Sequence, residues 1–387
     1  NPDLLVQITN YLGGKTYLNY ASSTSFLNRG SDGISDLGYP ITVIKSTIED
    51  NGMVGSHHTS SVYNYDYKNG SYNYSLKEFR GFGNVRVTDP LGNFKEYEYH
   101  QDDARKGQML AVTTKDKNGN LYAKKTYQWD TVNPEGYYIV LLSKDTNYLY
   151  DGTISNPKVT QNKYEYDSYG NTVKVTNEGD PNSVGDERYN FALYTYNTNN
   201  WIVDKLAHTH TTDASNNILT EAWYFYDGHS VISDPPTKGD LTKEKHWLNT
   251  GTSPEIIRVY DSYGNIIQEL DPKMYVTSYE YDITHTFPIK ETNPSGHIAR
   301  LQYDLGTGNL LSKTDPNGFV TRYVYDCYGR IIEEWRPYNT TSPVVQYRYP
   351  DYQIDGLAPD VVKVSYNMGG SKSLDKYTII DGQNRVI

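Results

Sequence analysis

Two histidines in alternate positions are the first residues whose types and spacing could do chemistry. His208 and His210 stand in the segment Ala-His-Thr-His-Thr, and on a β-strand both imidazole rings would lie on one face. Such a pair could begin a zinc site, but zinc takes three or four protein ligands, and no third or fourth ligand is evident nearby. We therefore expect two ordinary histidines, on the surface or facing a lumen.

Two neighbouring carboxylates, Asp102 and Asp103, follow His100 and could suggest acid–base catalysis. Adjacent side chains on a strand point to opposite faces, so we expect these carboxylates to be solvated. The single cysteine, Cys327, can form no disulfide within the chain and no thiolate metal site. The sequence contains no glycine-rich phosphate loop and no calcium loop. We therefore expect no catalytic, cofactor-binding or metal-binding residue in this chain, and no enzyme activity.

The composition excludes further classes of protein. Only 36% of the 387 residues are hydrophobic, yet 40 are Tyr. Disordered chains are poor in aromatic residues, so the tyrosines provide the apolar area of a folded structure. The net charge of −11 argues against a nucleic-acid partner. No run of 18 or more apolar residues could cross a membrane, and the two ends suggest a piece cut from a longer protein.

A repeat of 22 residues organises the second part of the chain. The dipeptide Tyr-Asp recurs from Tyr260 with spacings of 21, 22 and 22 residues, and a second marker of the Asp-Pro type alternates with it. The Tyr-Asp copies begin at Tyr260, Tyr281, Tyr303 and Tyr325, and the second marker begins at Asp271, Asn293 and Asp315, with an early copy at Asp89. Two markers that alternate at a fixed period indicate a repeat architecture.

Both markers have the residue preferences of tight turns. Asp opens a four-residue turn, Gly closes it with a positive φ, and Pro favours the second position of a type I turn. The residues that we assign to these structural turns are Asp167 and Gly170, Asp261 and Gly264, Asp315, Pro316 and Gly318, and Asp326 and Gly329.

Tyrosines at alternate positions indicate strands between the turns. Tyr97 and Tyr99, or Tyr323 and Tyr325, would each point to one face of a strand. Two strands of about seven residues and two four-residue turns fill one repeat. The sequence therefore predicts an all-β fold, an antiparallel β-hairpin meander of two dozen or more strands. Because large open sheets curl, we expect a spiral, hollow shell, of which this chain forms a part.

The double marker resembles the YD repeat, also called the Rhs repeat. The clearest stretch runs from Tyr303 to Pro337 and contains Tyr325-Asp326-Cys327-Tyr328-Gly329-Arg330-Ile331-Ile332. Residues 4–14, 79–85 and 100–103 resemble the region that precedes the repeats in the B component of bacterial Tc insecticidal toxins and related virulence proteins. We therefore expect a pre-repeat β region over residues 1–150 and a YD-repeat shell segment over 151–387, clearest at 260–337, in one continuous architecture.

The resemblance implies a container that delivers a toxin. In that family the shell encloses a C-terminal toxin polypeptide, often released by an aspartyl self-cleavage at a terminal Asp-Pro-x-Gly-Leu motif. Here Asp315-Pro316-Asn317-Gly318 is followed by Phe319, so we expect an ordinary turn and place any protease or toxin outside these residues. The implied partners are the C-terminal cargo, the rest of the shell and a translocation component. The implied location is secreted or on the bacterial cell surface.

Two other functions stay open. The same repeats resemble those of teneurins and of wall-associated Rhs proteins, which allows a surface adhesion protein. An enzyme or carbohydrate-binding module could also use Tyr rings as platforms. The Tyr positions follow the repeat register, however, which favours a structural role over such a module.

Overall fold

The chain folds into β-strands connected by tight turns. The computed structural model describes residues 3–10, 13–28, 36–53, 58–133, 136–150, 155–338, 341–349, 360–368, 373–380, 383 and 385–386. It contains 26 strands, and the described residues include no α-helix and no helix long and apolar enough to cross a membrane. Every described strand pair is antiparallel, and each strand pairs with the strand before or after it in the chain. The predicted all-β hairpin meander is confirmed.

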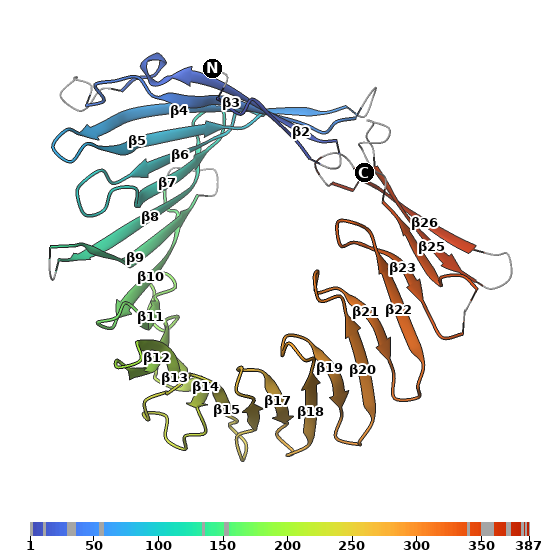
Figure 1. Cartoon of the computed structure of the whole chain (residues 1–387). Coiled ribbons are helices and arrows are strands. Elements are labelled where there is room, and N and C mark those ends of the chain that lie inside the picture. The colour runs from blue at the N-terminus through green and yellow to red at the C-terminus, as the bar shows by residue number, and fades with distance from the viewer. Residues whose placement is uncertain are drawn as a thin grey trace. The chain divides into compact units, whose positions relative to one another are not determined.

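The residues divide into two compact units, whose strands are labelled in Figure 1. Unit 1 comprises residues 1–191 and 211–219, and unit 2 comprises residues 192–210 and 220–387. The strands before residue 188 are β1 Gln7–Thr9, β2 Lys15–Ser22, β3 Thr42–Asp50, β4 Ser60–Asn73, β5 Glu78–Thr88, β6 Phe94–Tyr99, β7 Met109–Lys115, β8 Leu121–Val132, β9 Ile139–Leu149, β10 Lys158–Tyr166 and β11 Thr172–Asn177, with a short 3-10 helix at Ser23–Ser25.

Three strands contribute residues to both units, and twelve more complete unit 2. The three are β12 Arg188–Asn197, β13 Ile202–Asp213 and β14 Ile218–Tyr226. The twelve are β15 Leu241–His246, β16 Glu255–Tyr260, β17 Ile266–Leu270, β18 Val276–Tyr281, β19 Pro288–Thr292, β20 Ile298–Tyr303, β21 Leu310–Thr314, β22 Val320–Tyr325, β23 Ile331–Trp335, β24 Val345–Arg348, β25 Asp360–Asn367 and β26 Ser373–Ile380.

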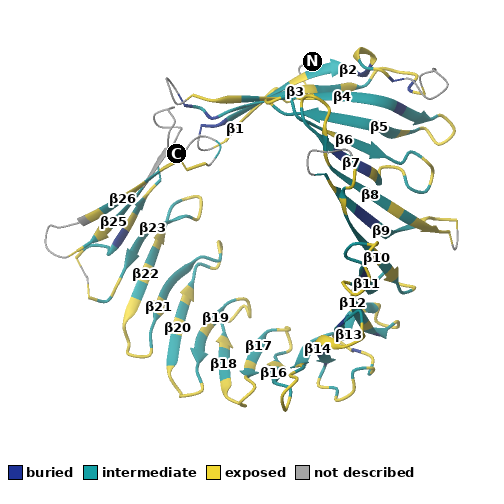
Figure 2. Ribbon diagram, turned by 180° about the vertical axis from the view of Figure 1, so that it is seen from behind, coloured by how far each residue is buried: buried dark blue, intermediate teal, exposed yellow. Residues whose placement is uncertain are grey.

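Most strand residues are neither buried nor fully exposed (Figure 2). The buried hydrophobic side chains among the described residues are Leu37, Met53, Ala111, Ala207, Ala222, Tyr226 and Val345. In β22 the alternation is visible residue by residue, because Tyr323 and Tyr325 are half-buried while Arg322 and Val324 are exposed. Sheets with two partly wet faces suit Tyr, whose ring stacks on neighbours while its hydroxyl stays hydrated or hydrogen-bonded. This explains how a chain of low hydropathy can fold.

Unit 1 has a small aromatic core beside its longest strands. Phe26 packs edge-on against Tyr67 with the ring centroids 5.3 Å apart, and Tyr67 lies 4.8 Å from Phe82. Phe79 packs edge-on against Phe82 at 5.6 Å. Such aromatic contacts add stability beyond the area they bury.

The repeat differs from the prediction in how its 22 residues are divided. Strands β16–β23 have five or six residues rather than seven. Most turns take a fifth residue, because the backbone N–H of Asp261 bonds the carbonyl of Asn265, and that of Asp315 bonds the carbonyl of Phe319. The turns that begin at Asp282 and Asp304 take a sixth. The strand residues that the sequence seemed to offer are therefore used to close the turns.

Hairpins at the Tyr-Asp turns also contain a shift in register. In β16–β17, Arg258 lies opposite Glu269, but Tyr260 lies opposite Ile266, so the outgoing strand has one extra residue. The same shift occurs at Tyr99, Tyr166, Tyr226, Tyr281, Tyr303 and Tyr325. An extra residue on one strand is a β-bulge, which bends the strand and increases its twist.

Candidate functional site

The Asp of each tight turn binds the turn's own backbone. In the turn that begins at Asp261, Oδ1 accepts hydrogen bonds from the N–H groups of Tyr263 at 2.8 Å and Asn265 at 2.9 Å. Oδ2 accepts from the side-chain amide of Asn265 at 3.1 Å, and the N–H of Gly264 bonds the carbonyl of Asp261 at 3.3 Å. Burial alone would raise the pKa of Asp261, but these bonds outweigh burial and lower the pKa. The carboxylate is thus fully used in holding the turn.

The other assigned turns share this geometry. The turns at Asp167, Asp315 and Asp326 have the same carboxylate-to-backbone bonds, and Gly170, Gly264, Gly318 and Gly329 all have φ between 77° and 87°. A type I turn followed by a residue in the left-handed region is a standard three-residue hairpin loop. Pro316 occupies the second turn position, where its fixed φ fits. Asp315-Pro316 is therefore built as a hairpin turn.

In three copies of the Tyr-Asp dipeptide, the Tyr connects consecutive Tyr-Asp turns. The hydroxyl of Tyr260 donates to the carbonyl of Leu241 at 2.9 Å, and that of Tyr281 donates to Ile266 at 3.2 Å. The accepting residue lies where the preceding Tyr-Asp turn returns to a strand. Tyr325 makes the equivalent bond to Leu310 at 2.9 Å. The dipeptide thus has two roles, since Asp closes its own turn and Tyr binds the end of the previous one.

Side chains of the turns add a second contact between repeats. The Tyr263 ring stacks on the His285 ring with the centroids 3.9 Å apart and the planes at 16°. The side-chain amide of Asn265 also donates to the carbonyl of His285 at 2.9 Å. Because each contact joins neighbouring turns, stability in this part of unit 2 is built up repeat by repeat.

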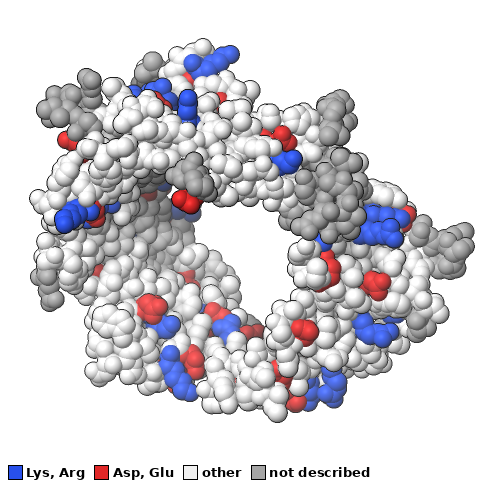
Figure 3. Space-filling view, turned by 45° about the horizontal axis from the view of Figure 1, so that its top comes forward, with Lys and Arg blue, Asp and Glu red and all other residues white. Residues whose placement is uncertain are grey.

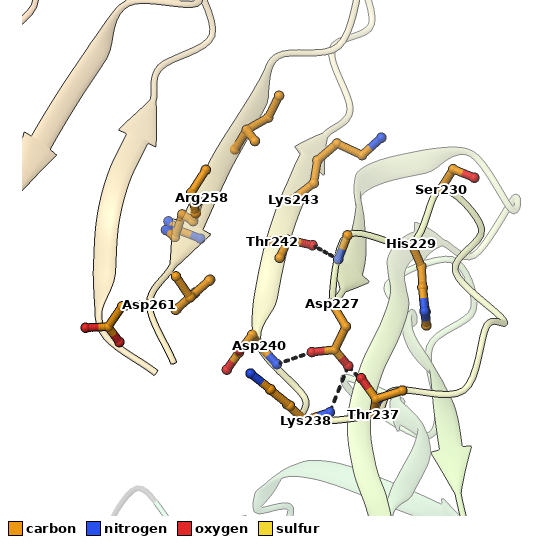
Figure 4. A pocket seen from close by; sticks show the side chains of 14 residues that line it. Asp227, His229, Ser230, Thr237, Lys238, Asp240, Thr242, Lys243, Arg258 and Asp261 are labelled. Atoms are coloured by element: carbon orange, nitrogen blue, oxygen red, sulfur yellow. Dashed lines mark hydrogen bonds between the residues drawn. The ribbon is translucent and has the colours of Figure 1, made fainter. Parts of the chain in front are cut away.

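The loop between β14 and β15 surrounds a carboxylate with backbone amides (Figure 4). Asp227 accepts hydrogen bonds from the N–H groups of Thr237, Lys238, Gly239 and Asp240 at distances from 2.6 to 3.2 Å. Burial alone would raise the pKa of Asp227, but the four N–H donors outweigh burial and lower the pKa. Successive N–H groups that converge on an anion form a nest. Here the anion is the protein's own side chain.

This loop borders an open pocket of 590 Å³ between β15 and β16. Two of its charged side chains are engaged: Arg258 donates to Glu244 at 2.7 Å and to Glu269 at 2.9 Å, and Lys243 lies 4.1 Å above the Phe225 ring. A general base or nucleophile needs a side chain that is free to reach the substrate. Arg258 and Lys243 are therefore held by neighbouring side chains at this pocket.

His208 and His210 share a face of β13, and their rings are stacked with centroids 5.2 Å apart. The His208 ring also stacks on Trp223, and its Nε2 lies 2.8 Å from the Glu221 carboxylate. Rings stacked in parallel direct their nitrogen lone pairs alongside each other, not toward one point. Among the described residues no group of three His, Cys, Asp or Glu side chains could hold a metal ion.

Asp102 and Asp103 lie at the turn between β6 and β7 and point to different partners. Asp102 pairs with Arg105 at 3.1 Å, and Asp103 contacts Arg80. Arg80 also donates to the carbonyl of Gln101 at 3.0 Å. Asp103 therefore holds the turn onto β5 through Arg80, while Asp102 bonds within the turn itself. Positive and negative side chains are also interspersed on the face shown in Figure 3, without a large region of one sign.

Sequence reasoning missed several partners of the candidate residues. The acceptors of the Tyr hydroxyls are backbone carbonyls, which carry no sequence signal. The Asn that follows the turn Gly, as in Asn171 and Asn265, is visible in the sequence as a recurring Asp-x-x-Gly-Asn pattern, and could have been found. Glu221 and Trp223 lie on the strand after His208, and only the pairing of strands brings them to it.

The sequence and the fold both match known proteins. Residues 1–113 match the family described as the insecticide toxin TcdB middle/N-terminal region, and residues 303–341 match the RHS repeat family. A search of curated proteins found no match.

Solved structures with this fold contain Tc toxin components. The crystal structure of TcdB2-TccC3 is 14% identical and has a TM-score of 0.79, and the match covers 99% of this chain and 29% of that chain. TcdB2-TccC3 without its hypervariable C-terminal region is 13% identical with a TM-score of 0.79, covering 100% and 31%. The Photorhabdus luminescens Tc holotoxin pore is 14% identical with a TM-score of 0.67, covering 92% and 25%. Residues 1–113 are thus similar to a TcdB middle/N-terminal region and residues 303–341 to an RHS repeat, and the chain shares its fold with TcdB2-TccC3.

Proposed function

We propose that this chain is a structural segment of a YD-repeat shell that encloses and delivers a C-terminal toxin polypeptide. The observation that carries the proposal is the match to TcdB2-TccC3 over 99% of the chain at a TM-score of 0.79. The chain spans only 29% of the length of that relative, so the cargo and the rest of the shell would lie in other parts of the parent assembly.

The chemistry of the described residues agrees with a container. The turn carboxylates bind their own backbone, Tyr hydroxyls such as that of Tyr260 bind neighbouring turns, and Arg258 beside the β15–β16 pocket is paired with Glu244. These contacts stiffen a thin wall and leave catalysis to other segments. The pre-repeat region over 1–150 and the YD segment over 151–387 would then be two stretches of one wall.

Partners and location follow from the relatives by analogy. Solved relatives include a complex of TcdB2-TccC3 with Cdc42 and a holotoxin pore. For this chain we propose the C-terminal cargo and the remaining shell as direct partners, a translocation component as a further partner, and secretion from a bacterial cell.

The test uses the natural full-length protein with its partner subunit. We expect a C-terminal polypeptide that is separate in denatured intact mass but remains with the native particle and resists added protease. An uncut chain whose C-terminal region is digested in the native state would contradict the container and favour the adhesion function.

Two proline variants test whether the wall itself gives this protection. Val324→Pro places proline in the middle of β22, where it disrupts strand pairing. Ser262→Pro is the matched control, because it places proline at the turn position that Pro316 occupies naturally. We expect protease to reach the cargo in V324P and not in S262P. Equal protection in both variants would show that this segment does not enclose the cargo.

A further inference from the structure

A row of polar side chains crosses five strands of unit 1, from β13 to β9. The hydroxyl of Thr211 bonds Asn190 at 2.8 Å, Asn190 bonds Asn177 at 2.7 Å, and Asn177 bonds Asn162 at 2.8 Å. The side-chain amide of Asn162 then reaches the carboxylate of Asp145 at 3.3 Å. Each link joins side chains on neighbouring strands, so the row runs across the sheet.

The charge at the end of the row dictates the orientation of every member. An ionised carboxylate only accepts hydrogen bonds, so Asn162 must turn its NH₂ group toward Asp145. Its carbonyl then faces Asn177, which must in turn present its own NH₂, and the same holds for Asn190. All four bonds therefore point the same way, and aligned bonds polarise and strengthen one another.

Asp145 is an unusual residue for a thin sheet because only 2% of it is exposed. Lys125 of β8 lies 3.2 Å from its Oδ1, and the Tyr164 hydroxyl of β10 donates to its Oδ2 at 2.7 Å. The remaining ionisable side chain that faces it is Tyr127, which lies directly opposite on β8 beneath the Lys125 ammonium. A buried charge is tolerated only when it is paired and hydrogen-bonded, as here.

The row lies where the 22-residue spacing is not kept. Sheets whose two faces are both partly polar specify register weakly, and a slip by one residue would move every side chain to the other face. Here a slip would place Lys163 or Gln161 rather than Asn162 opposite Asp145. Either slip would remove the side chain that connects Asp145 to Asn177.

We infer that Asp145 is the charged anchor of an acid-released register latch, in which Asn162, Asn177, Asn190 and Thr211 hold strands β9–β13 in one register while Asp145 is ionised. Protonation would turn Asp145 from an acceptor alone into a donor as well. It would also remove the ion pair with Lys125 and the reason for the common orientation of the asparagines. The latch does not depend on the proposed function.

Its pH dependence has a definite sign. Burial alone would raise the pKa of Asp145, but Tyr164, Lys125 and Asn162 outweigh burial and lower the pKa. A carboxyl group with a lowered folded pKa stabilises the fold above its unfolded pKa, near about 3.9, and the stabilisation is lost as the pH falls through the folded value. Strands β9–β11 should therefore lose protection in acid.

The test is hydrogen exchange with mass spectrometry on the complete 387-residue chain at pH 7 and pH 3, read as protection factors for β9–β12 and for β18–β22. Asn177→Ala breaks the row in its middle, and Asn19→Ala is the matched control, because Asn19 makes a single cross-strand bond to Ser46 away from the row. We expect N177A to lower protection of β10–β12 at pH 7 by about tenfold, because it removes two part-buried hydrogen bonds. N19A should leave those strands unchanged.

Asp145→Asn removes the charge of the side chain and keeps its shape. It therefore tests the latch even if N177A does not fold. We expect it to lower the protection of β9–β11 at pH 7 and to abolish most of the further loss between pH 7 and pH 3, relative to β18–β22. Equal effects of N177A and N19A, or an acid loss in D145N as large as in the natural protein, would overturn the latch.

Discussion

Met274 occupies a turn position that favours glycine, and its replacement should stabilise the protein. Met274 has φ 65° in the turn that begins at Asp271, where the equivalent turn at Asp315 has Gly318 with φ 84°. A left-handed conformation costs a non-glycine residue about 1–2 kcal/mol, and glycine loses about 0.5–1 kcal/mol more than alanine in chain entropy on folding. Because the Met274 side chain is 57% exposed, little apolar burial is lost. Met274→Gly should therefore stabilise the turn by about 0.5–1 kcal/mol.

The opposite substitution, at the equivalent glycine, provides the matched variant. A Cβ at Gly318 would meet no atom within 4 Å, so Gly318→Met tests the backbone cost alone. Since 1.4 kcal/mol corresponds to about tenfold, we expect amide exchange in β17 and β18 to slow about two- to fivefold in M274G. Exchange in β21 and β22 should quicken by a similar factor in G318M.

A control in the same turn separates backbone strain from loss of a side chain. Lys273 precedes Met274, and its φ is not positive. Lys273→Gly should therefore give no protection and should weaken the turn slightly through chain entropy. If M274G quickens exchange, or if M274G and K273G behave alike, the assignment of strain to Met274 is wrong.

Three further outcomes follow from the site. Tyr260→Phe should lower the free energy of unfolding by about 1 kcal/mol, because it removes one hydrogen bond. Amide exchange in β15 and β16 should then be faster. Asp227→Asn should release the 228–240 loop, because the amide NH₂ faces N–H donors, and limited proteolysis should then cut the loop more rapidly than in the natural chain. Burial and the neighbouring His208 lower the pKa of His210. The fold should therefore be most stable above the unfolded pKa of about 6.5, and it should lose this stability as the pH falls. The fluorescence of Trp223, measured as the difference from a W223F variant, should change over that pH range. A signal that does not change with pH would contradict this prediction.

Local signals in the sequence were enough to predict the hairpins and the fold class. The roles of Asp261 and Gly264 can be predicted from a stretch of five residues, because the carboxylate and the positive φ act on the same turn. Alternating tyrosines such as Tyr323 and Tyr325 likewise report on a single strand. The 26-strand meander follows from repeating such elements.

Contacts between strands could not be predicted in the same way. Asn162, Asn177 and Asn190 are 15 and 13 residues apart, and nothing in that spacing shows that they form one row. The stack of His208 on Trp223 also depends on the pairing of β13 with β14. The division of the repeat into shorter strands was missed because the bond that closes each turn involves backbone atoms alone.

The extra residue in each Tyr-Asp hairpin determines which way the tyrosines face. Paired residues on neighbouring strands share a face, and side chains alternate along each strand. With the bulge, Arg258 lies opposite Glu269, and Tyr260 and Tyr281 then share one face. Without it, Arg258 would lie opposite Gln268, and Tyr281 would emerge on the face opposite to Tyr260.

The bulge is thus a parity correction, an odd step inserted once in each Tyr-Asp hairpin. Without that step, successive tyrosines would alternate between the two surfaces of the sheet, and no row of hydroxyls could reach the preceding turns. Because the correction is repeated with the motif, any number of repeats added in series would keep one tyrosine-bearing surface and one surface free of these rings.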